Sequence, residues 1–228
     1  MLKVQLTRDL RKNVLRGHPW IYREAIQVPS KANKACLCEV LDKKKKPLGW
    51  AIYSPEGPLA LRIISTEKKP PNQNFFESRM SAALKAREGI NRSQTNAFRL
   101  FNGEGDGLPG MVCDVYGPLA ILQFDGDSCY EFWDQEFVAG WLISNAIVEG
   151  VYCKPRRNDN RDPLTFGEIP KDDLVDIKEN GNTFVVNFVD GQKTGFFLDQ
   201  RDNREYLRSI SKDKTVLNLF SYTGGFSI

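Results

Sequence analysis

The residues with the clearest chemical potential lie near the end of the chain, where the apolar run Val216 to Phe220 meets the polar turn Ser221-Tyr222-Thr223-Gly224-Gly225. Glycine has no Cβ, so the backbone N–H groups of such a turn can approach a ligand closely. The pattern is typical of the first strand of a parallel α/β sheet and the turn that follows it. The turn does not match the G-x-G-x-x-G fingerprint. Spacing alone therefore leaves an ordinary strand and turn, without a ligand, as an alternative.

A second polar segment, Lys193-Thr194-Gly195, precedes two aromatic residues and the run Leu198-Asp199-Gln200-Arg201. Asp199 is a favourable N-cap for a helix that we expect over residues 199–210. Judged by spacing alone, the exit of a hairpin with a surface lysine is the simpler interpretation of this segment.

Taken together, the two segments resemble the PUA-domain class I methyltransferases that form 5-methylcytosine in large-subunit ribosomal RNA. The family pattern is Lys-Thr-Gly, two aromatic residues and Leu-Asp-Gln-Arg, followed by Asn-x-Phe-Ser-Tyr-Thr-Gly-Gly-Phe, and it stands here at 193–201 and 218–226. Asn102 to Gly110 and His18 to Tyr22 also match, in the family's order. The resemblance thus spans nearly the whole chain, with Gln192 standing where some relatives carry His.

The resemblance implies S-adenosylmethionine as the cofactor, held by residues of these two segments. An aromatic side chain such as Phe197 can pack on adenine or contact the sulfonium cation. The cofactor-binding residues implied are Lys193, Thr194, Gly195, Phe197, Arg201, Ser221, Tyr222, Thr223, Gly224 and Gly225.

The chemistry of the family adds a cysteine thiolate to C6 of cytosine, which makes C5 nucleophilic toward the methyl group before a base removes the C5 proton. That cysteine lies late in the family's methyltransferase domain. None of the five cysteines of this chain aligns with it: Cys36, Cys38, Cys113, Cys129 and Cys153. We therefore expect an rRNA methyltransferase whose catalytic residues lie outside this chain, and we expect the chain to be the front part of a longer enzyme.

Composition sets wide limits on function. The 228 residues carry a net charge of +3, which permits an RNA partner without demanding one. Five sparse cysteines without a Cys-x-x-Cys pair, and a single histidine, argue against a zinc site, so we expect no metal. The first residues do not form a signal peptide and no apolar run reaches membrane-spanning length. We expect a cytoplasmic protein without a membrane partner.

One loop invites a different interpretation. Asn102 to Gly107 places oxygen ligands at alternate positions, like the calcium loop of an EF-hand. The twelfth position, however, is Cys113 and Pro109 lies inside the loop. We expect instead a tight turn that joins two strands and faces the cofactor site.

Two basic stretches are candidates for contact with RNA phosphates. For both, a solvated loop is the simpler interpretation, and arginine's fork geometry favours phosphate contact as the alternative. The candidate RNA-binding residues are Lys43, Lys44, Lys45 and Lys46 in the first stretch, and Arg156 and Arg157 in the second.

The order of patterns predicts an α+β protein in three parts. A PUA-like β pseudobarrel occupies 1–70, with a helix over 9–16 and strands over 20–28, 35–42, 48–53 and 59–65. A central α+β domain occupies 73–190, with helices from about 76 and over 130–145 and a hairpin turn at Asn180-Gly181. Residues 191–228 begin a Rossmann-like methyltransferase domain, whose first strand is expected over 216–220.

Two other functions fit part of the pattern. A non-enzymatic PUA-type RNA-binding protein needs no cofactor domain, and a dinucleotide-dependent oxidoreductase needs the missing G-x-G-x-x-G. The apolar strand expected over 216–220 also predicts an adhesive edge, and with it a homodimer.

Overall fold

The computed structural model describes residues 1–30, 32–156 and 159–227. The strands are β1 (Leu2–Gln5), β2 (Trp20–Tyr22), β3 (Cys36–Leu41), β4 (Pro47–Tyr53), β5 (Leu59–Ser65), β6 (Ala97–Asn102), β7 (Met111–Tyr116), β8 (Leu119–Phe124), β9 (Gly150–Cys153), β10 (Leu164–Gly167), β11 (Leu174–Glu179) and β12 (Asn182–Asn187). The α-helices are α1 (Arg11–Leu15), α2 (Gln73–Ala86), α3 (Asp127–Phe132), α4 (Gln135–Ser144) and α5 (Arg201–Ile210). Short 3-10 turns are η1 (Arg23–Ala25), η2 (Gly103–Asp106) and η3 (Leu198–Gln200).

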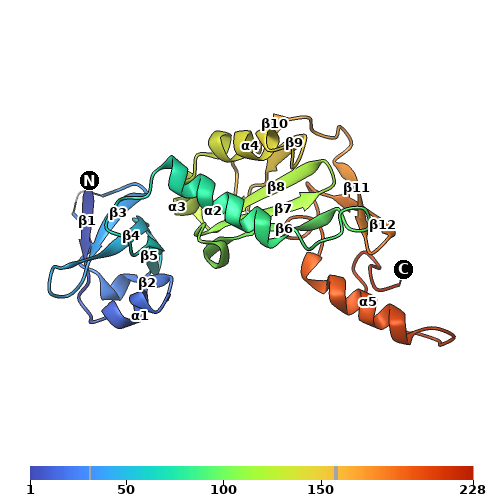
Figure 1. The fold of residues 1–228 in the computed structure, drawn as a ribbon, viewed down its shortest axis with the longest axis horizontal. Helices are drawn as coiled ribbons and strands as arrows, with labels where there is room; N and C mark the ends of the chain where they lie inside the picture. The colour runs from blue at the N-terminus through green and yellow to red at the C-terminus, as the bar shows by residue number, and fades with distance from the viewer. Residues whose placement is uncertain (31, 157–158, 228) are drawn as a thin grey trace.

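The N-terminal unit is a five-stranded sheet in the order β1-β3-β4-β5-β2, with α1 beside it (Figure 1). Only the β1–β3 pair is parallel. Its core combines buried aliphatic residues of the strands with Val14 of α1. The strand expected over 20–28 ends at Tyr22, where η1 turns the chain, so β2 is a short edge strand.

The central unit is built in three layers around a second sheet, in the order β10-β9-β8-β7-β6. Alternate residues of β8 face opposite layers, as the two-residue period of a strand requires. Ala120 and Leu122 pack with α2 and α4, whereas Leu119 and Ile121 pack with the hairpin of β11 and β12. The strand β10 did not stand out from the sequence.

The helix expected over 130–145 is wrong as a single element, since the chain forms α3 and α4 with a break at Trp133 and Asp134. The Asp134 carboxylate accepts a hydrogen bond of 3.0 Å from the Phe137 amide and begins α4 as its N-cap. The Trp133 indole donates to the Pro109 carbonyl at 3.0 Å. These two bonds make a sharp corner more favourable than a continuous helix.

The loop after β6 joins the two units, so the expectation that it faces the cofactor site is wrong. Glu104 accepts a hydrogen bond of 2.7 Å from the Trp20 indole and also binds Arg62 of β5. Arg62 binds Asp125 as well, and its guanidinium lies 5.9 Å from the centre of the Trp20 ring. Although burial opposes the charge of Glu104, Trp20 and Arg62 hold the pKa of its carboxyl below the usual value.

The predicted strand over 216–220 is wrong in this structure, because these residues are extended or irregular and pair with no described strand. Phe220 has a φ of 56°, in the left-handed region that does not continue a strand. The predicted N-cap Asp199 is also wrong: it lies in η3, and α5 begins at Arg201 without a side-chain cap.

None of the helices in the described residues is long and apolar enough to cross a membrane. Within the same residues, no group of three or more His, Cys, Asp or Glu is arranged to hold a metal ion. The carboxylates of the calcium-like loop are engaged otherwise, since Asp106 forms a two-pronged ion pair at 2.7 Å with Arg87, the residue that follows α2.

Candidate functional site

Two segments that are separate in the sequence meet to line a cavity of about 600 Å³ near the end of the chain. One segment runs from the loop after β12 into α5, and the other is the irregular tail beyond α5, which Figure 1 shows folding back beside the helix. The lining residues are Gln192, Phe196, Phe197, Gln200, Arg204, Asn218, Leu219, Phe220, Ser221, Tyr222, Thr223, Gly225 and Phe226.

Aromatic rings form one wall of this cavity. Phe197 and Tyr222, one from each segment, meet edge to face with their ring centres 5.5 Å apart. The Tyr222 hydroxyl accepts a hydrogen bond of 3.0 Å from the backbone N–H of Gln192. The ammonium group of Lys193 lies 4.8 Å from the centre of the Phe197 ring, so this ring already receives a cation on its face.

The glycine turn forms a second wall. Gly224 donates its N–H to the Ser221 carbonyl at 2.8 Å, and its φ of 76° suits the left-handed conformation that glycine adopts freely. The side-chain amide of Asn218 donates a hydrogen bond of 2.8 Å to the Ser227 hydroxyl, which closes the tail into a loop. Ser221 and Thr223 also line the cavity on this side.

A buried ion pair attaches α5 to the hairpin beneath the cavity. Arg204 donates to both carboxylate oxygens of Glu179 at 2.6 and 2.7 Å, and a third bond of 2.9 Å reaches the Phe197 carbonyl. Its guanidinium lies 4.6 Å from the centre of the Phe196 ring. The side chains of Arg204 and Glu179 are only 9% and 3% exposed, so the pair is shielded from water.

The structure brings five of the ten predicted cofactor-binding residues to the cavity: Phe197, Ser221, Tyr222, Thr223 and Gly225. Thr194 is buried against the central sheet instead, and Arg201 pairs with Asp202 at 3.1 Å. Lys193, Gly195 and Gly224 shape the two segments without lining the cavity.

Sequence reasoning missed several lining residues, among them Gln192, Phe196, Gln200 and Arg204. Gln200 and Arg204 are four residues apart, the spacing that puts two side chains on one helix face. This spacing was the available signal. Lys154, at the end of β9, holds the loop from another side by donating to the Gly191 carbonyl at 2.6 Å, and burial lowers the pKa of its amine.

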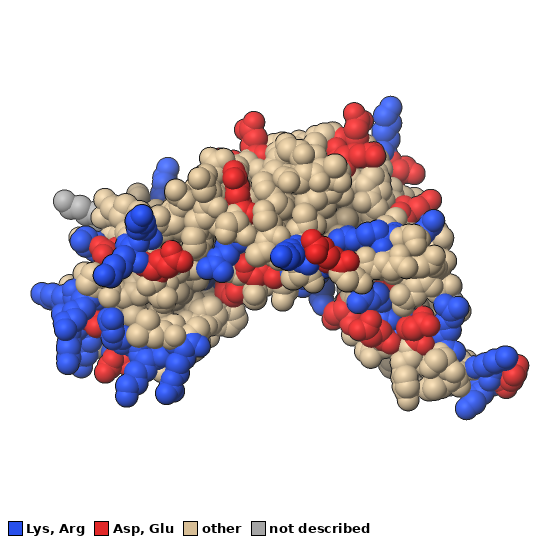
Figure 2. Space-filling model, in the orientation of Figure 1, with Lys and Arg blue, Asp and Glu red and all other residues tan. Residues whose placement is uncertain are grey.

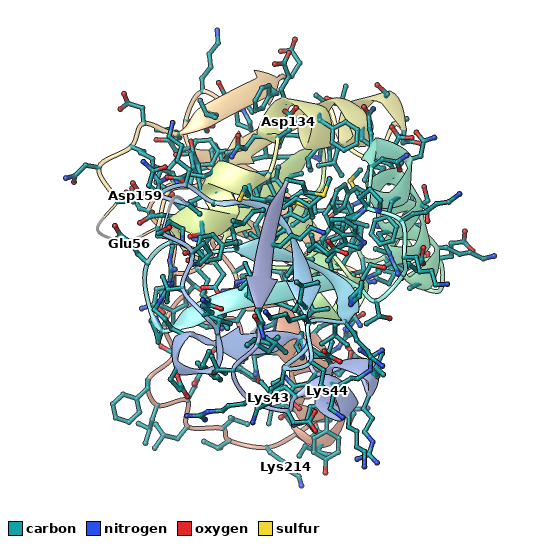
Figure 3. All side chains as sticks on the ribbon, turned by 90° about the vertical axis from the view of Figure 1, so that its left-hand side faces the viewer. Lys43, Lys44, Glu56, Asp134, Asp159 and Lys214 are labelled. Atoms are coloured by element: carbon teal, nitrogen blue, oxygen red, sulfur yellow. The ribbon has the colours of Figure 1, made fainter. Side chains whose placement is uncertain are left out.

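The four candidate RNA-binding lysines Lys43–Lys46 form the exposed turn between β3 and β4. Asp42 organises the turn, because its carboxylate accepts hydrogen bonds of 2.9 Å from the amides of both Lys44 and Lys46. In Figure 3, Lys43 and Lys44 lie together at one end of the N-terminal unit. The four lysines therefore project from a turn whose backbone is held by hydrogen bonds to Asp42.

Charge is distributed unevenly along the chain. Residues 1–70 contain 15 lysines and arginines against six acidic residues, so they carry +9, and residues 71–228 carry −6 of the total of +3. Figure 2 shows the blue side chains gathered over the N-terminal unit. The chain as a whole is only mildly charged, but its N-terminal unit is strongly positive. Such a charge is the electrostatic feature expected of a domain that binds nucleic acid.

In the second basic stretch, acidic residues balance more of the positive charge than in the first. Arg156 lies 3.3 Å from Asp125, while Arg161 binds Asp127 and Asp159. Arg157 lies outside the described residues. Arg156, Arg161 and Asp159 line a second cavity of about 770 Å³ between the N-terminal and central units, as does Glu56 (Figure 3).

The five cysteines lack the character of a nucleophile. Burial raises the pKa of Cys129 to about 11 and that of Cys153 to about 12. It also raises the pKa of Cys38 and Cys113, and to a smaller extent that of the half-buried Cys36. A thiol must ionise to attack, so these side chains are poorly suited to covalent catalysis at neutral pH.

Two known families match parts of the chain. Residues 4–66 match the family described as PUA-like domain, and residues 153–228 match the family described as S-adenosylmethionine-dependent methyltransferase.

Curated relatives match almost the whole chain. It is 33% identical over 234 residues to ribosomal RNA large subunit methyltransferase I of Tolumonas auensis, with 99% of this chain and 59% of the relative covered. The enzyme of the same name from Vibrio parahaemolyticus is 36% identical over 234 residues, with 99% and 58% covered. The chain thus spans less than two thirds of the length of these relatives.

Solved structures agree on the fold. A protein of Streptococcus mutans assigned to the SAM-dependent methyltransferases matches with a TM-score of 0.82 and 29% identity, over 100% of this chain and 59% of that one. A second protein assigned as a methyltransferase, crystallised with SAH, matches with a TM-score of 0.83 and 28% identity over the same shares.

Proposed function

We propose that this chain, which belongs to the PUA-containing S-adenosylmethionine-dependent methyltransferases, takes part in the transfer of a methyl group to large-subunit ribosomal RNA. It contributes RNA-binding surface and one side of the cofactor site. The acceptor we propose is C5 of a cytosine, and the place of action is the cytoplasm.

The observation that carries the proposal is the meeting of the segments 192–204 and 218–226 around one cavity. They are the two parts of the chain whose residue types suggested cofactor chemistry, and nothing in their spacing required them to meet. A volume of about 600 Å³ lies within the roughly 300–1,000 Å³ of typical cofactor sites.

The residues at the cavity fit S-adenosylmethionine. When bound, this cofactor supplies a methyl group activated by a sulfonium cation. The Phe197 ring accepts a cation on its face, as its contact with Lys193 illustrates, and the Tyr222 ring offers a neighbouring apolar surface. The Ser221 and Thr223 hydroxyls offer hydrogen bonds to ribose and amino-acid groups, and Gly225 allows close approach of the backbone.

We propose a division of labour among three parts of the chain. Residues 1–70, with Lys43–Lys46, hold RNA through its phosphates, and residues 73–190 carry the central fold with Arg156 and Arg157 as further RNA contacts. Residues 191–228 open the methyltransferase domain. The ten cofactor-binding residues act in two ways in this proposal: some line the cavity and others, such as Lys193 and Gly195, shape the loops.

We place the nucleophilic thiolate outside these residues. The burial of the cysteines supports this, since the pKa of Cys129 is about 11 and that of Cys153 about 12, well above neutral. On this basis the 228 residues alone bind cofactor and RNA but transfer no methyl group.

We predict that this chain binds SAH, the demethylated cofactor, only weakly, with a dissociation constant of about 0.1–1 mM, or about −4 to −5.5 kcal/mol. The cavity wall is largely open to water, since Leu219 is 67% exposed and Phe220 fully exposed. Amide chemical shifts on titration with SAH measure the affinity, and the perturbed amides should fall within 192–204 and 218–226.

The same titration separates the rival functions. Shifts with NADH in place of SAH would favour an oxidoreductase, and shifts with neither would favour a non-enzymatic RNA-binding protein. Methyl transfer from labelled S-adenosylmethionine to large-subunit rRNA by the 228 residues alone would contradict the assignment of the nucleophile to residues outside them.

We also propose that two copies of the chain associate through the exposed apolar side chains of α5 and the tail beyond it, namely Tyr206, Ile210, Val216 and Leu217. These side chains are 46–80% exposed. We expect light scattering to show a mass that rises with concentration, and the variant Val216→Ser/Leu217→Ser, which spares the cavity lining, to stay monomeric. A wild-type chain that is monomeric at every concentration, with a protease-resistant tail, would reject this association.

A further inference from the structure

Thr194, although it belongs to the Lys-Thr-Gly segment, turns its side chain away from the cavity and into the central unit. The residue is 1% exposed. Its hydroxyl lies 2.6 Å from an oxygen of Asp114 and 2.9 Å from the hydroxyl of Tyr116, both on β7. Asp114 is itself fully buried and is held by the Arg99 guanidinium at 2.8 and 3.0 Å.

The protons of this cluster can be assigned from the donors present. The Asp114 carboxylate only accepts, so Thr194 donates to it and must accept from Tyr116. Tyr116 then accepts the Phe196 N–H at 3.2 Å. Burial raises the pKa of the Tyr116 phenol, which keeps it protonated and able to donate. The result is one continuous series of donors from the Phe196 amide to a buried carboxylate.

This series ends at the wall of the cavity. Phe196 lines the cavity and its ring packs 5.1 Å from that of Phe184 in the hairpin, so fixing its amide fixes the start of the aromatic wall. The loop must also pass very close to β12. A Cβ added to Gly195, whose φ is 132°, would lie 2.7 Å from Val186. Lys154 holds the start of the loop at the Gly191 carbonyl, and the Thr194 hydroxyl is the polar anchor next to this tight passage.

We propose that Thr194 is a positioning residue for the cofactor, which acts through Asp114 and Tyr116 to hold residues 195–197 in the geometry that binds S-adenosylmethionine. The inference rests on the proposed function, and it assigns to Thr194 a role apart from contact with the cofactor. It also means that the central sheet sets the shape of the cofactor site.

The test compares the wild-type chain with Thr194→Val, which keeps the shape of the side chain, and Thr194→Ser, which keeps the hydroxyl. Thr183→Val, at an exposed position of β12, is the matched control. Amide hydrogen exchange and SAH-induced shifts are recorded by NMR, with urea unfolding in parallel. Tyr116→Phe is the second variant, since it removes the acceptor of the Phe196 amide and leaves the bond between Thr194 and Asp114.

We expect Thr194→Val to speed exchange at Phe196 and Phe197 and to weaken SAH binding, each by roughly 10- to 100-fold, as the loss of one hydrogen bond to a charged group predicts. Thr194→Ser should restore both, Thr183→Val should change neither, and Tyr116→Phe should reproduce the faster exchange at Phe196. Exchange should stay unchanged in β7 and β8, whereas a merely structural role would raise it throughout the sheet.

Two results would overturn the inference. Equal SAH affinity in the wild-type chain and Thr194→Val would reject the positioning role while leaving the proposed function intact. Faster exchange across the whole central sheet would assign Thr194 to general stability. Absence of SAH binding in the wild-type chain is a different failure, because it rejects the cofactor site itself.

Discussion

Replacing Arg204 by methionine is expected to loosen α5 from the hairpin by about 3–5 kcal/mol, the usual effect of leaving a buried charge without its partner. Glu179, with its side chain 3% exposed, would keep its carboxylate in a site that water reaches poorly. Native-state hydrogen exchange measures this as a rise of at least about 100-fold in the rates of the α5 amides. The cavity lining at Phe197 should loosen with the helix.

Two controls make this result specific. Glu205→Ala removes an exposed pair with Arg208 at 3.6 Å on the same helix and should cost about 0.5 kcal/mol or less. The double variant Arg204→Met/Glu179→Leu should recover most of the loss, because an apolar pair can replace a buried ion pair. A single variant as stable as the wild type would show that the pair contributes nothing to docking.

Replacing Lys43–Lys46 by glutamine should lower the salt dependence of RNA binding more than any comparable change elsewhere. Each phosphate contact contributes roughly 0.7 to the slope of log affinity against log salt for single-stranded RNA, so four contacts predict a change of about 2.8. The turn itself should survive, because backbone amides make its bonds to Asp42. Titration of a structured rRNA fragment at several salt concentrations provides the measurement.

The matched control is Lys212→Gln/Lys214→Gln, which removes two exposed charges beyond α5 and should leave the slope unchanged. Arg156→Ala should change the slope by about 0.7 at most, because Asp125 already neutralises part of that charge. A slope that is identical in the lysine variant and the wild type would remove the β3–β4 turn from the RNA surface.

Local signals in the sequence determined several elements correctly. Asn180 and Gly181 form the predicted hairpin turn with φ values of 48° and 82°, and this turn joins β11 to β12. Few other residues accept two successive positive φ values, so a two-residue pattern is enough. The residue types at 193–201 and 218–226 likewise marked both segments that line the cavity.

Contacts between distant residues decided the rest. The helix expected over 130–145 breaks because the Trp133 indole finds the Pro109 carbonyl, a partner more than 20 residues away. The tail at 216–220 has strand-like residues but no neighbouring strand to pair with in the described structure. A hydrophobic pattern records the tendency of a segment, whereas its final form depends on what packs against it.

By itself the sequence marked the two segments that line the cavity, 193–201 and 218–226, because residue types and their order are local properties of the chain. Only the tertiary structure decided which of their side chains face the cavity. Thr194 turns toward Asp114 and leaves the cavity, while Arg204, unmarked in the sequence, lines it and binds Glu179. The direction of a side chain depends on the partners that burial leaves available, and those partners come from strands and helices far away in sequence.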